Sequence, residues 1–68
     1  MKAFVLIADG EYTESINGVE TTTKKLEPIV GFATQARADG VLVSRIYDVK
    51  EPSKWKSYAI SVYSVEML

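Results

Sequence analysis

The dipeptide Asn17-Gly18 determines where this chain reverses its direction. A two-residue type I′ turn requires positive φ at both central positions, and Asn followed by Gly adopts this conformation with little strain. The flanking residues, 11–16 and 19–23, are polar and rich in threonine. We therefore predict a hairpin over 11–23 that forms a solvated ribbon or a sheet edge.

Two other parts of the chain have the composition of strands. Residues 2–8 are apolar at almost every step, which is typical of a strand covered on both faces, and Asp9-Gly10 is expected to end it. Residues 41–49 and 54–65 are rich in β-branched and aromatic side chains and are separated by a loop containing Pro52. These two segments predict a second hairpin, in which Arg45 lies opposite Tyr58 and either stacks on it or pairs with Asp48.

A helix is predicted over residues 28–39. Pro28 suits the first helical position because its missing N–H would be unpaired there, and Gly40 suits a left-handed C-cap. Gly31 weakens this prediction, because glycine in a helix interior is about 1 kcal/mol less favourable than alanine. The alternative is an all-β small barrel in which residues 28–36 form another strand.

The predicted fold is a single α+β domain over residues 1–68, in the order strand, hairpin, helix, hairpin. Its antiparallel sheet has about four to five strands and one short helix on one face. Apolar residues occur on both sides of the predicted strands, so the face without the helix must be exposed or covered by another chain. In the predicted second hairpin that face is centred on four residues, Leu42, Ile46, Trp55 and Tyr63.

The amino-acid composition limits the reactions and the ligand sites that this chain can support. The chain has no Cys and no His, which excludes disulfides, ordinary zinc sites and mechanisms based on histidine or a thiol. Five oxygen-bearing residues loosely resemble a calcium loop: Asp9, Glu11, Glu14, Asn17 and Glu20. The glycine that such a loop needs at its sixth position is Glu14 here, and no helices flank it, so we expect neither a metal nor another cofactor. We also expect no catalysis, since the serines have no activating partner.

We therefore predict a non-enzymatic, cytoplasmic protein-binding module, with homodimerisation as one form of the contact. Its size and chemistry suit a small phage or mobile-element protein that modulates or inhibits a host protein complex. No membrane association is expected, because the longest apolar run has six residues, from Ala3 to Ala8. The alternative is a nucleic-acid-binding module with a basic and aromatic hairpin, formed by Lys50, Lys54, Trp55, Lys56 and Tyr58. The net charge of −1 argues against a general nucleic-acid coat.

Overall fold

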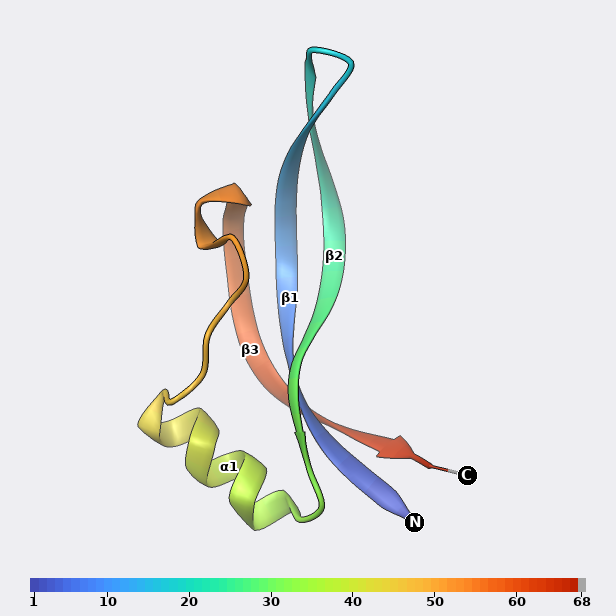
Figure 1. The fold of residues 1–68 in the computed structure, drawn as a ribbon, viewed down its shortest axis with the longest axis vertical. Helices are drawn as coiled ribbons and strands as arrows, with labels where there is room; N and C mark the ends of the chain where they lie inside the picture. Colours follow the sequence, from blue (N-terminus) through green and yellow to red (C-terminus); the bar gives the residue numbers. More distant parts are fainter. Residues whose placement is uncertain (68) are drawn as a thin grey trace.

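The computed structural model describes residues 1–67, which form a three-stranded antiparallel sheet and one helix (Figure 1). The elements in chain order are β1 (Lys2–Ile16), β2 (Val19–Phe32), α1 (Gln35–Ser44), the 3₁₀ turn η1 (Pro52–Lys54) and β3 (Trp55–Glu66). The strand order is β2-β1-β3, so β1 is central and both of its neighbours are edge strands. The predicted α+β class is confirmed, but the sheet has three strands rather than four to five.

The Asn17-Gly18 turn is confirmed. Asn17 has φ 53° and Gly18 has φ 79°, and Ile16 lies directly opposite Val19. The predicted end of the first strand at Asp9-Gly10 is wrong, because residues 2–16 form one continuous strand. Gly10 serves instead to let β3 approach, since a Cβ there would lie 2.0 Å from the carbonyl oxygen of Ser57.

The predicted helix over 28–39 is wrong in position. β2 continues to Phe32 and includes Pro28, which is tolerated because β2 is an edge strand and Ile29 forms a bulge beside it. Helix α1 begins after Thr34, whose hydroxyl accepts a hydrogen bond from the Arg37 N–H at 3.4 Å. Gly40 lies in the helix interior rather than at the C-cap, which is Arg45 with φ 57°.

The predicted hairpin between 41–49 and 54–65 is also wrong. Residues 41–44 belong to α1, and residues 45–54 form a loop that ends in η1. β3 pairs with β1 instead, with Ala8 opposite Ile60. The all-β alternative is right that the chain is extended at 28–32 and wrong about the barrel.

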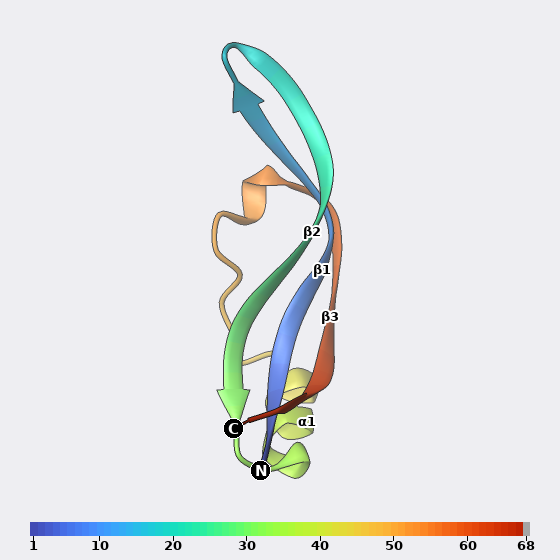
Figure 2. The ribbon, with the colours of Figure 1, turned by 90° about the vertical axis from the view of Figure 1, so that its right-hand side faces the viewer.

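The core lies between the sheet and the segment that contains α1 and the following loop. Its buried members are Leu6, Ala8, Tyr12, Ala38 and Trp55. Figure 2 shows α1 behind the lower part of the strands and the following loop to the left of them. The opposite face carries no other element of the described chain.

Candidate protein-binding face

The sheet surface that points away from α1, here called the open face, follows from the alternation of side chains along the strands. Residues directly opposite each other in an antiparallel pair share a face. Leu6, Ala8 and Tyr12 point to the core, so the odd-numbered residues of β1 and their partners point away from it. The apolar members of the open face are Ala3, Val5, Ile7, Leu26, Pro28, Ala59, Tyr63 and Val65.

Several large side chains of the open face are well exposed. Leu26 is 58% exposed, Val65 42% and Tyr63 36%, while Val5 and Ile7 are half-buried beneath them. Figure 2 looks onto the sheet from the side opposite α1 and shows no helix in front of the strands. The monomer therefore leaves large apolar side chains of β2 and β3 in contact with water on this face.

A shallow hollow on this surface is bordered by both signs of charge. It has a volume of about 470 Å³ and is lined by Asp9, Lys24, Lys25, Leu26 and Tyr63. Glu11 lies directly opposite Lys24 in the sheet, and its carboxylate is 3.9 Å from the Lys56 ammonium. Asp9 lies on the central strand between Leu26 and Ala59, so charge reaches into this end of the open face, while the other end, around Val5 and Tyr63, is apolar. Apolar area beside charged and polar groups is typical of a protein-binding surface.

The structure does not bring together the four residues predicted to form this face. Leu42 is half-buried in α1, Ile46 is 75% exposed just after it, and Trp55 is 7% exposed in the core. Tyr63 alone of the four lies on the open face. The predicted grouping assumed that residues 41–49 form a strand, and their helical and loop conformation separates them.

No family model, no curated protein and no solved structure matches this chain. Its function is therefore inferred from the geometry of its surfaces.

The residues of the alternative basic and aromatic site are mostly engaged within the chain. The Lys54 ammonium is 3.5 Å from Glu51, and Lys56 faces Glu11. The Trp55 ring packs edge-on against Tyr12, at 5.2 Å between centroids, and against Tyr58, at 5.6 Å. A buried indole offers no free face on which a base could stack.

A cluster of polar and aromatic side chains that no sequence pattern predicted attaches the 45–54 loop to the sheet. The Tyr12 hydroxyl donates a hydrogen bond to the Glu51 carboxylate at 2.8 Å, and the Lys25 ammonium lies 4.0 Å from the centre of the Tyr12 ring. This hydrogen bond and burial raise the pKa of Tyr12 to about 12, and the same bond, with Lys54 nearby, lowers the pKa of Glu51. The predicted contacts of Arg45 with Tyr58 or Asp48 are replaced by its role as the C-cap of α1.

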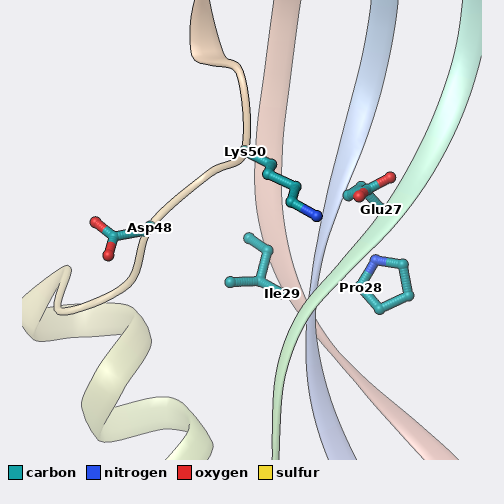
Figure 3. A pocket seen from close by; sticks show the side chains of 5 residues that line it. All are labelled: Glu27, Pro28, Ile29, Asp48 and Lys50. Atoms are coloured by element: carbon teal, nitrogen blue, oxygen red, sulfur yellow. The ribbon is translucent and has the colours of Figure 1, made fainter.

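A second hollow lies between this loop and β2 (Figure 3). It has a volume of about 270 Å³ and is lined by Glu27, Pro28, Ile29, Asp48 and Lys50. In Figure 3 Lys50 extends from the loop toward β2, while Asp48 points away from the hollow. Charges of both signs border this small space, so it has no field of one sign that would select an ion.

Two further findings on the described residues concern metal binding and membrane insertion. Within residues 1–67, no three acidic side chains are placed so that they could hold a metal ion together. The single helix among them, α1, has ten residues and is too short to cross a bilayer.

Proposed function

We propose that this chain is a small, non-enzymatic protein-binding module whose open face covers an apolar surface of another protein. The observation that carries the proposal is the exposure of Leu26, Tyr63 and Val65 on a sheet face that no other described element covers. Complete burial of one large aliphatic side chain stabilises a complex by about 1.5–3 kcal/mol. Tyr63 adds a residue type that is common among binding hot spots.

A module of this kind acts by occupying a surface. Its small size and its mixture of apolar and charged surface suit a modulator or inhibitor that blocks contact between subunits of a larger complex. A phage or mobile-element protein that acts on a host complex would be of this kind.

The test is affinity capture from the native cell with two lysine variants. Leu26→Lys places a charge on the β2 side of the open face, where Asp9 lies opposite and can compensate it in the free protein. Val43→Lys is the matched control, because Val43 is 82% exposed on α1, away from that face. We expect wild type and Val43→Lys to retain the same partner and Leu26→Lys to lose it. Equal retention by all three proteins would remove the open face from consideration.

The salt dependence of the captured complex separates the two classes of partner. Contact through the apolar side chains of the open face is expected to change less with salt than contact with phosphate groups. Phosphate contacts by Lys50, Lys54 and Lys56 would weaken steeply as counterions compete. A nucleic acid that is released by salt and retained by Leu26→Lys would support the alternative function.

A further inference from the structure

The outer edge of β3 is open for strand pairing. β3 lies at the end of the strand order and pairs with β1 on its inner side. Among the described residues, no backbone group of 56–66 forms a hydrogen bond outside this pairing. Every second residue of β3 therefore points its N–H and C=O away from the sheet, toward solvent.

The two edges of the sheet differ in how they resist pairing. β2 carries Pro28, the Ile29 bulge and charged residues at 24, 25 and 27, all of which discourage the addition of another strand. Residues 57–65 of β3 contain no charge, no proline and no glycine. Such an edge is a template for another strand unless it is covered.

The total surface of the chain indicates how much is left to cover. Its accessible area is 5116 Å², whereas a compact monomer of 7.5 kDa is expected to expose about 4,200 Å². The excess of roughly 900 Å² is close to the ~800 Å² that each partner contributes to a stable interface. Leu6 is the largest side chain that is completely buried, so the chain's own core is small.

We propose that a second copy of this chain pairs with the outer edge of β3, in antiparallel orientation, about a two-fold axis at Ser61. The excess exposed area is a property of the chain itself. A second copy of the chain is present wherever the chain is made and can cover this area. An isologous contact also requires a surface that complements itself. Centred on Ser61, the pairing places Tyr63 opposite Ala59 of the second copy and Val65 opposite Ser57 of the second copy, so on the open face each of these large side chains faces a small one. On the core side the same register places Val62 opposite Ile60 of the second copy.

This dimer would contain a continuous six-stranded sheet with both α1 helices on one side. The two open faces would then form one larger apolar surface on the other side. The proposal uses the edge of β3 rather than the open face, so it stands independently of the proposed function.

The test is the mass of the protein in solution, measured by sedimentation equilibrium over a range of concentrations. We expect wild type to have twice the chain mass of 7.5 kDa. Ser61→Lys places two like charges opposite each other at the axis, and Ser61 is exposed, so this variant should be a folded monomer by circular dichroism. Val19→Lys, at the tip of the first hairpin, adds the same charge away from β3 and should remain a dimer.

A thiol at the axis gives a second readout that does not depend on a lysine variant folding. The chain has no Cys, so Ser61→Cys carries a single thiol, and mild oxidation should link two copies rapidly. Val43→Cys, on α1, should not form this link efficiently. A wild-type monomer at all concentrations would overturn the proposal, as would a dimer that Ser61→Lys leaves intact. Loss of partner capture by Leu26→Lys with an unchanged dimer mass would show that the two surfaces act separately.

Discussion

At the scale of single residues, the contact between Tyr12 and Glu51 holds the long loop against the sheet. Glu51 has φ 50°, a left-handed conformation that costs a non-glycine residue free energy. Its backbone carbonyl accepts from the Lys54 N–H at 3.0 Å, and its carboxylate accepts from the Tyr12 hydroxyl. These bonds fix the position of η1 and therefore the point at which β3 begins.

This contact should make the free energy of unfolding depend on pH in both the acidic and the alkaline range. The folded state lowers the pKa of Glu51 below 4.5, so its contribution is present above that pH and is lost as pH falls through the folded pKa. The folded state raises the pKa of Tyr12 from 10.0 to about 12, so that contribution is present below pH 10 and is lost as pH rises toward 12.

The matched variant is Tyr12→Phe, which keeps the ring and removes the hydroxyl. We expect wild type to exceed it in free energy of unfolding most strongly between about pH 5 and pH 10, with the difference shrinking at both extremes. Urea unfolding at acidic, neutral and alkaline pH measures this difference. A difference that is the same at all three would show that the hydroxyl does not form this bond.

At the scale of elements, two glycines have opposite roles. Gly10 lies in β1 where β3 approaches so closely that an added Cβ would lie 2.6 Å from the Tyr58 Cα. Gly40 lies inside α1 with open space around the position of a Cβ. The same substitution should therefore change stability in opposite directions.

We expect Gly40→Ala to stabilise the protein by about 1 kcal/mol, since it removes the entropic cost of glycine in a helix. Gly10→Ala should destabilise it by about 3 kcal/mol or more, because the backbone of β3 must move. Thermal unfolding measures both changes, and 1 kcal/mol corresponds to roughly 4–8 °C in a domain of this size. Stabilisation by Gly10→Ala would contradict the close approach of β1 and β3.

The sequence predicted those elements that depend on local chemistry. Asn17-Gly18 specifies its own turn, and the alternation within β3 correctly separates Tyr63 from Ile60. Residues 41–43 are β-branched or apolar, yet they form a helix because the Thr34 cap and packing against the sheet outweigh a weak strand propensity. Propensity alone could not reveal this competition.

Three features of the sheet and its attached loop depended on tertiary structure. A bulge at Lys56 places Trp55 opposite Tyr12, which moves its ring from the expected face into the core. The hydrogen bond between Tyr12 and Glu51 joins residues 39 positions apart, and no sequence periodicity marks it. Leu26 lies in a stretch that the sequence analysis assigned to no element, so its place on the open face emerged only from its pairing with Asp9.

At the scale of the whole molecule, the chain is a thin, one-sided structure. Its extents are 43 × 29 × 13 Å, and α1 with the following loop covers one side of the sheet. Leu26 and Val65 stay exposed on the side that no described element covers, so a protein partner there would bury apolar surface. We expect this partner to contact the open face and not α1.

Methyl cross-saturation in the complex with the captured partner tests this claim most directly. Saturation of the partner's protons should transfer to the methyl groups of Leu26 and Val65 on the open face. The methyl groups of Val43, which are exposed on α1, serve as the internal control. We expect strong intensity loss at Leu26 and Val65 with little at Val43, and the reverse pattern would contradict a contact through the open face.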